Sequence, residues 1–150
     1  MQPRTLFRIV SVAEAVTWTA LLIAIILRAT GGDVPFFFAV GLAHGVVFFA
    51  FVASTVVVGL NQRWPWWLVL VTALTSIPPY GTVVMDAVLE RTGRLRGGWR
   101  RHASDDPRDA RWVDRALRFF LLRPWLFVVV LVLVIALLTV VALVAGPPGR

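Results

Sequence analysis

Long apolar runs constrain the fold of this chain more than any other feature. Runs of at least 20 residues with almost no charge cover residues 6–27, 36–60 and 126–145, and a further run at 66–89 is interrupted at residues 78–81. Roughly 20 apolar residues are needed for a helix to cross the hydrocarbon of a bilayer. Hydrophobic residues make up 59% of the 150-residue chain, more than the roughly 45–50% of soluble domains. The sequence predicts an all-α integral membrane bundle of four apolar segments.

The first run is also compatible with a signal peptide, because Arg4 and Arg8 precede it. However, the run is longer than a typical signal core, contains Glu14 and is not followed by a convincing small-residue cleavage site. We therefore interpret it as a membrane helix.

The third run is broken by Pro78, Pro79 and Gly81. Two prolines remove backbone donors, and the glycine further breaks helical continuity. The segment is therefore either a kinked span or a re-entrant hairpin. A broken backbone at membrane depth is tolerated only where protein or a wet cavity covers it, so we expect the break to pack inside the bundle.

Residues 93–123 form the one long polar stretch, an arginine-rich loop followed by a predicted amphipathic helix. Asp106 and Pro107 suit the N-cap and first position of that helix. Its basic face is expected to contact anionic lipid headgroups rather than nucleic acid. The alternative is a solvated extension of the last apolar helix. The arginines predicted to share the face are Arg108, Arg111, Arg115 and Arg118.

The arginines also indicate sidedness, because positively charged loops stay in the cytoplasm. A re-entrant third segment would leave few arginines outside, whereas four full spans agree better with segment lengths. Both models place residues 90–123 in the cytoplasm of a multi-pass cell-membrane protein. The expected organisation is a three-segment membrane domain at 1–92, the basic segment at 93–123, an anchor helix at 124–146 and a tail at 147–150.

Three ionisable residues lie within or beside the apolar runs: Glu14, His44 and Asp86. A charge at the centre of a membrane helix costs roughly 2.5–3.5 kcal/mol on insertion scales, so such residues face the bundle and find partners. His44 lies between Gly41 and Gly45, a spacing that lets another helix approach closely. A hydrogen bond between Glu14 and His44 is feasible at these depths.

These residues have both a structural and a functional interpretation. Buried polar pairs can fix helix register, and intramembrane ionisable groups are also candidates for ion or proton pathways. Glu14 and His44 suit either role equally, whereas Asp86 favours a structural or interfacial one. A cluster of Glu14, His44 and Asp86 is possible only if the third segment is re-entrant.

Other chemistry is missing from the sequence. The chain has no cysteine, and it contains no zinc-protease, nucleophile-elbow or phosphate-loop motif. Glu14 and His44 alone are too few for a closed metal site. We therefore expect no enzyme activity, no cofactor and no metal.

Several short motifs occur in a characteristic order along the first 92 residues. The sequence resembles a family of small bacterial integral membrane proteins known as domain of unknown function 3817, over about residues 4 to 92. The family pattern has Glu-Gly and Pro-Phe-Gly where this chain has Glu-Ala and Pro-Tyr-Gly. The resemblance implies a location and an architecture, but no activity. The motif residues are Arg8, Glu14, Thr17, His44, Gly45, Pro79, Tyr80, Gly81, Thr82 and Asp86.

The sequence thus predicts a membrane protein that acts by association, as an accessory, scaffold or self-associating subunit. The alternative is an oligomeric transport or proton-relay element that uses Glu14 and His44. Expected partners are the bilayer and either a second copy or another membrane protein.

Overall fold

The computed structural model describes residues 1–145, except for the side chains of residues 135, 138, 139, 142, 143 and 145. The predicted tail at 147–150 and residue 146 lie outside the described part. Within it the chain forms helices and no strand, so the all-α class is confirmed. The elements are α1 (Pro3–Ala29), α2 (Phe37–Asn61), α3 (Trp66–Leu74), α4 (Gly81–Arg91), η1 (Pro107–Ala110), α5 (Trp112–Leu122) and α6 (Pro124–Ala145).

The chain divides into two compact units between Trp99 and Arg100, rather than between residues 92 and 93 as expected. The reason is that residues 93–99 are tied to the first unit. The Trp99 indole donates a 2.8 Å hydrogen bond to the carbonyl of Met1. Leu95 belongs to the buried hydrophobic core of this unit. We describe the two units separately.

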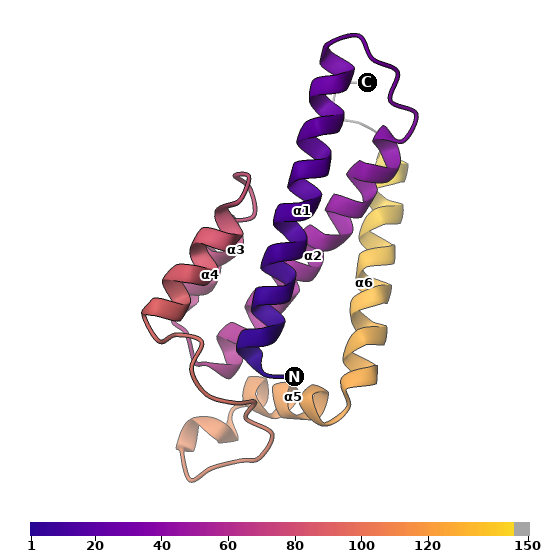
Figure 1. Ribbon diagram of the computed structural model, residues 1–150. Helices are drawn as coiled ribbons and strands as arrows, with labels where there is room; N and C mark the ends of the chain where they lie inside the picture. Colours follow the sequence, from indigo (N-terminus) through magenta and orange to yellow (C-terminus); the bar gives the residue numbers. More distant parts are fainter. Residues whose placement is uncertain (146–150) are drawn as a thin grey trace. The chain divides into compact units, whose positions relative to one another are not determined.

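Helices α1 and α2 form the long antiparallel pair of the first unit (Figure 1). Both are long and apolar enough to cross a membrane, and their bounds lie within a few residues of the predicted runs. Helix α1 begins early because Pro3 takes the first helical position, where a missing N–H costs nothing. At the core, the Phe7 ring lies 5.4 Å from that of Phe51 and 6.2 Å from that of Trp64.

Helices α3 and α4 form a hairpin, so the third apolar segment is not one straight span. With nine and eleven residues, they are about 14 and 16 Å long, well short of the roughly 30 Å of hydrocarbon. The two outer ends of the hairpin meet where the Trp64 indole donates a 3.0 Å hydrogen bond to the Arg94 carbonyl. The third segment is thus a hairpin, and its re-entry into the membrane from one side stays a prediction.

The break between the two short helices follows from the local backbone. Helix α3 ends at Leu74, and Tyr80 has the left-handed conformation (φ 64°) just before α4 begins. A Cβ on Gly81 would lie 2.3 Å from the Thr75 carbonyl oxygen. Only glycine fits there, because any side chain would push the chain out of this tight turn.

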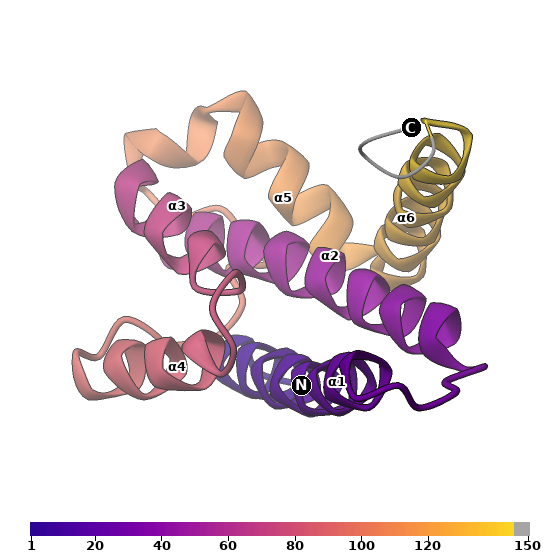
Figure 2. The same cartoon turned by 90° about the horizontal axis from the view of Figure 1, so that it is seen from above.

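Each arm of the hairpin packs against a different long helix (Figure 2). Helix α3 lies beside α2, and α4 lies beside α1. The α2–α3 approach is close at Gly59, where an added Cβ would lie 2.7 Å from the Val69 side chain and 3.2 Å from the Trp64 ring. This glycine, rather than Gly41 or Gly45, is where α2 meets another helix of the same chain at close range.

The second unit differs from the predicted single helix that begins at Asp106. Asp106 does act as a cap, accepting a 2.9 Å hydrogen bond from the backbone N–H of Arg108, but it starts only the short 3-10 turn η1. The chain is extended at Arg111 before α5 begins. The turn is held instead by the Asp109 carboxylate, which accepts hydrogen bonds of 2.7 Å from both the N–H and the hydroxyl of Ser104.

Helices α5 and α6 meet at a sharp bend of 105°. Helix α6 covers 22 residues, enough to cross a bilayer by length alone. Among the described residues, only α1 and α2 qualify individually as candidate spans, and the start of α6 qualifies only together with α5. The anchor role of α6, and with it the count of four membrane segments, stays a prediction.

Candidate functional site

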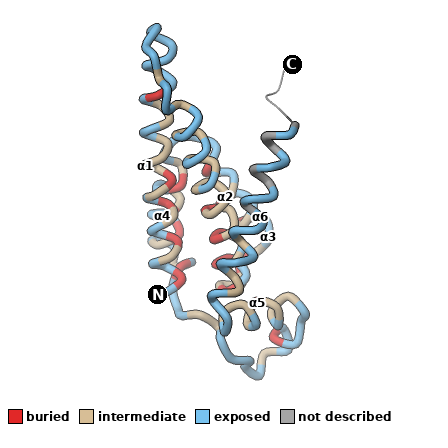
Figure 3. The backbone as a smooth tube through the Cα atoms, turned by 90° about the vertical axis from the view of Figure 1, so that its right-hand side faces the viewer, coloured by how far each residue is buried: buried red, intermediate tan, exposed pale blue. Residues whose placement is uncertain are grey.

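The charged and polar residues of the first unit gather where α1 faces α4. Residues spaced three or four apart lie on one face of a helix, and both helices carry such a row. We call this set of residues the polar seam. Buried residues occur along both helices in Figure 3. The seam consists of Arg4, Arg8, Ser11 and Glu14 on α1 and Thr82, Asp86 and Glu90 on α4.

Ion pairs form the outer half of the polar seam, near the start of α1. Arg4 pairs with Glu90, and Arg8 pairs with both Glu90 and Asp86. The Asp86 side chain is 6% exposed and that of Arg8 is 47% exposed. The arginines therefore reach in from the surface towards acids that are more deeply placed.

Glu14 forms the inner half of the seam and is fully buried. The Thr82 hydroxyl lies 2.8 Å from Glu14 Oε2 and 3.2 Å from the Ser11 carbonyl oxygen. It has one proton to share between these two acceptors. A threonine of the α3–α4 hairpin thus holds the acid of the first long helix.

Three buried oxygens of the seam have no hydrogen-bond partner among the described residues. They are Ser11 Oγ, Glu14 Oε1 and Asp86 Oδ1. Buried polar atoms are nearly always paired, so such a group calls for an explanation. Chemically, the seam presents hydroxyl and carboxylate oxygens, which favour a hard cation, water or a proton.

His44 lies on α2 and is received by α1, but not by Glu14. Its Nδ1 lies 3.1 Å from the Thr17 hydroxyl, and its ring lies 4.6 Å from that of Trp18. Thr17 also lies 2.9 Å from the Glu14 carbonyl oxygen. The hydrogen bond considered feasible between Glu14 and His44 is not formed, because the Glu14 carboxylate binds Thr82 on α4.

The cluster of Glu14, His44 and Asp86 is likewise not formed, although the third segment is a hairpin. Asp86 pairs with Arg8 about two turns from Glu14 along α1. The three residues therefore have three different sets of partners. The structure brings Glu14 and Asp86 into one seam and places His44 at the α1–α2 contact.

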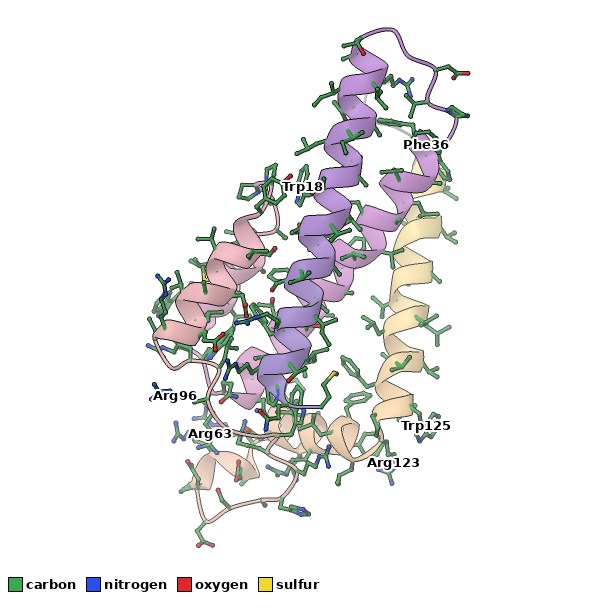
Figure 4. All side chains as sticks on the ribbon, in the orientation of Figure 1. Trp18, Phe36, Arg63, Arg96, Arg123 and Trp125 are labelled. Carbon is green, nitrogen blue, oxygen red and sulfur yellow. The ribbon has the colours of Figure 1, made fainter. Side chains whose placement is uncertain are left out.

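The tip of the hairpin is also tied to α1. The Trp18 indole donates a 3.1 Å hydrogen bond to the Ser76 carbonyl, and the Thr19 hydroxyl lies 3.2 Å from that of Tyr80. Figure 4 places Trp18 beside the tip. One carbonyl near the break of the helix, that of Ser76, thus has a side-chain donor. The sequence alone does not indicate that Trp18 or Arg8 pairs with the third segment.

Gly41 and Gly45 meet no other helix at close range. An added Cβ at either position would have no atom within 4 Å. The close helix approach predicted from their spacing is therefore not made by another helix in the described part of this chain. Both positions remain open on α2.

The four arginines predicted to share a basic face do not behave as one set. Arg108 lies in η1 and pairs with Asp106 at 2.8 Å. Arg118 turns towards η1 and donates a 2.6 Å hydrogen bond to the carbonyl of Asp109. Arg111 and Arg115 are exposed. The expected face is thus reduced because Asp109, expected only as an acid in the first turn of the helix, draws Arg118 inward.

Among the described residues, no group of three or more histidine and acidic side chains is placed to hold a metal ion. The geometry as a whole defines a class: a helical membrane protein with two long apolar helices and a short helical hairpin clasped to the first of them.

Comparison with known proteins places the chain in a family. The model of the family described as "Domain of unknown function (DUF3817)" matches residues 4–91. The chain belongs to this family, and the resemblance inferred over residues 4 to 92 is confirmed.

A protein of Streptomyces coelicolor named as a "putative membrane protein" is 32% identical over 94 residues. The match covers 59% of this chain and 11% of that relative, so the chain spans only a small part of the length of the curated relative. No solved structure matches.

Proposed function

We propose that this protein acts by association within the cell membrane, as an accessory, scaffold or self-associating subunit. The observation that carries the proposal is the open surface of α2 at Gly41 and Gly45, where a Cβ would meet nothing within 4 Å. Small residues let two helix backbones approach closely, and van der Waals packing drives association in lipid. Leu42 and Phe38 beside them are 41% and 64% exposed, which supplies apolar surface around the glycines.

The length of the relative supports the same proposal. The matched region makes up 11% of the Streptomyces coelicolor protein. In that protein the related sequence therefore occurs beside much more chain. A small membrane module that works next to other segments suits an accessory or scaffold role.

The polar seam supports a structural rather than a transporting use of its charges. Arg4 and Arg8 are paired with Asp86 and Glu90 across α1 and α4. These contacts hold a short hairpin against a long helix. In this interpretation the seam is a clasp that gives the associating surface a fixed shape.

The second candidate is an oligomeric transport or proton-relay element that uses Glu14 and His44. It is favoured by the complete burial of Glu14 and by the unpartnered oxygen on its carboxylate. The Thr17 hydroxyl connects the two residues, because it contacts both the backbone carbonyl of Glu14 and the ring of His44. Because no direct carboxylate–imidazole bond links them, we rank this function below association.

For topology, we propose that residues 90–123 face the cytoplasm and lie near anionic headgroups. The hairpin returns the chain to the end of the bundle where α1 begins, so the arginines around Arg63 and Arg96 gather at that end (Figure 4). Positive loops favour the cytoplasmic side. In the second unit, exposed Arg111 and Arg115 and the 74% exposed Trp112 suit an interfacial helix.

Cross-linking in membranes tests the association directly. The chain has no native cysteine, so a Leu42→Cys variant reports on one position of the open α2 surface. We expect covalent dimers that decrease by about tenfold in a Gly45→Leu background, which corresponds to about 1.4 kcal/mol of lost association. If the association is instead with another protein, the same variant would form a cross-linked product of a different mass.

The matched control is Ala43→Leu, which adds the same bulk to the opposite side of α2, where the residue is exposed. We expect cross-linking of Leu42→Cys to persist in this background. Cross-linking that is equally lost with Ala43→Leu, or absent in every background, would contradict the proposal.

A further inference from the structure

We propose that the polar seam binds a monovalent cation through Glu14 Oε1, with Ser11 Oγ and Asp86 Oδ1 as further oxygen ligands. The inference goes beyond association and does not depend on it. It rests on the charge balance of the seam, on its unpartnered oxygens and on their placement.

The seam carries one more acid than base. Its acids are Glu14, Asp86 and Glu90, and its bases are Arg4 and Arg8. Both arginines are used by Asp86 and Glu90, which leaves Glu14 with uncharged side-chain partners, Thr82 and Trp18. A buried carboxylate without a counter-charge is costly, so it must be neutralised. One bound positive charge balances the seam.

The unpartnered oxygens show where that charge would lie. Ser11 and Glu14 are 0% exposed and Asp86 is 5% exposed. Each has one buried oxygen without a hydrogen-bond partner among the described residues. Nearly every buried polar atom in a folded protein is paired. Three such atoms in one seam, all of them able to act as acceptors, are the donor set that a cation needs.

Helix spacing places the three residues at successive levels of the seam. The Thr82 hydroxyl contacts both the Glu14 carboxylate and the Ser11 carbonyl, which fixes α4 at this level of α1. Asp86 follows Thr82 by four residues, about one turn or 6 Å along α4. A cation at Glu14 with one or two waters would therefore reach all three oxygens.

The chemistry of the ligands selects the kind of ion. Carboxylate and hydroxyl oxygens favour hard cations over soft ones. A divalent ion would leave the seam with an excess positive charge, whereas a monovalent ion neutralises it. Sodium is therefore the first probe.

Thermal unfolding of the full chain in detergent tests the proposal. The melting temperature is measured in chloride salts of sodium, potassium, lithium and choline at equal ionic strength. We expect at least one of the three metal cations to raise the melting temperature above that in choline, saturably and by at least about 3 °C, since a ligand stabilises the state that binds it. Equal melting temperatures in all four salts would overturn the proposal.

Two variants locate the site. Glu14→Gln removes the charge and is expected to abolish the cation effect. Ser11→Ala keeps every charge and is expected to weaken the apparent affinity by about tenfold, which is one lost ligand contact of about 1.4 kcal/mol. The matched control is Asp33→Asn, which removes an exposed acid outside the seam and is expected to retain the full effect.

The variants also exclude the main competing explanation. If Glu14 instead holds a proton, stability would vary with pH but not with the cation, and the cation proposal would be wrong. If Glu14→Gln does not fold, Ser11→Ala decides: an unchanged affinity would contradict the site. Cross-linking of Leu42→Cys that is absent in every background would refute association without affecting this result.

Discussion

Helix α1 has two neighbours in the first unit, and it meets them by different chemistry. Towards α2 it presents apolar rings, with Phe7 packed against Phe51 and Trp64, and one neutral contact between Thr17 and His44. Towards α4 it presents the polar seam, with ion pairs at one end and a buried acid at the other. The long helix α2 is thus held against α1 mostly by packing, and the short helix α4 by ion pairs and hydrogen bonds.

The difference follows from which helix–helix contacts lipid tails can replace. Lipid tails compete well with apolar side chains, so apolar contacts alone give little preference for one helix over the bilayer. A helix of 25 residues such as α2 can span the membrane whatever packs against it. A hairpin of two short helices cannot, so it needs contacts that lipid does not offer. Ion pairs and hydrogen bonds in the seam provide them.

The largest effect is expected at Arg8. Arg8→Ala leaves the nearly buried Asp86 without its guanidinium, and should lower the free energy of unfolding by about 3 kcal/mol, the low end for a broken buried pair because Arg8 itself is half exposed. Denaturant unfolding in mixed micelles measures this. An Arg8→Ala/Asp86→Ala double variant should recover part of the loss, and a strictly additive loss would contradict a direct pair.

A smaller effect is expected on the apolar side. Phe51 is fully buried, and Phe→Ala in soluble cores costs about 3–5 kcal/mol. In a membrane part of that cost disappears, because lipid solvates the phenylalanine ring when the helices separate in the unfolded state. We therefore expect Phe51→Ala to cost about 2 kcal/mol in the same unfolding assay. A loss larger than that of Arg8→Ala would reverse the comparison between the two faces.

Thr82→Val separates the inner half of the seam from its ion pairs. It removes the hydroxyl that contacts Glu14 Oε2 and keeps the side-chain shape. The expected cost is about 1–2 kcal/mol, because a buried carboxylate oxygen loses a hydrogen bond. Thr92→Val is the matched control, since Thr92 is exposed at the opposite end of α4 and its hydroxyl bonds only to carbonyls of its own backbone turn. Equal losses in both variants would argue against a special role for Thr82.

The smallest effect is expected at Thr17. Thr17→Val removes the contact with His44 and should cost about 0.6 kcal/mol, the average for hydrogen bonds between membrane helices. Because that contact is already lost in the Thr17→Val background, His44→Phe should cost slightly less there than it does alone. A coupling above about 2 kcal/mol between the two sites would indicate that His44 is more than a packing residue.

The sequence predicted the helices well because apolar runs and helix breakers act locally. The bounds of α1 and α2 and the break near Pro78 and Pro79 follow from length, hydropathy and missing backbone donors. Glu14 was singled out because a buried acid in an apolar run has a cost that any fold must meet.

The partners of these residues depend on which helices become neighbours, and periodicity does not contain that information. Arg8 was interpreted as a sidedness signal near a helix end, although it pairs with Asp86, 78 residues away. Thr82 is small and uncharged, so placing it in the membrane has no large free-energy cost that would indicate a required partner. The amphipathic helix starts late because Asp109 binds Ser104 and Arg118, which is a tertiary arrangement.

The central claim is that residues 66–91 form a hairpin clasped to α1, not a span. Single cysteines at Trp66, which is 77% exposed, and at the exposed Arg94 flank this segment in a chain with no native cysteine. Labelling with a membrane-impermeant maleimide in sealed vesicles of known orientation reports the side of each. The account predicts that both cysteines are labelled from the same side of the membrane. Labelling from opposite sides would contradict it.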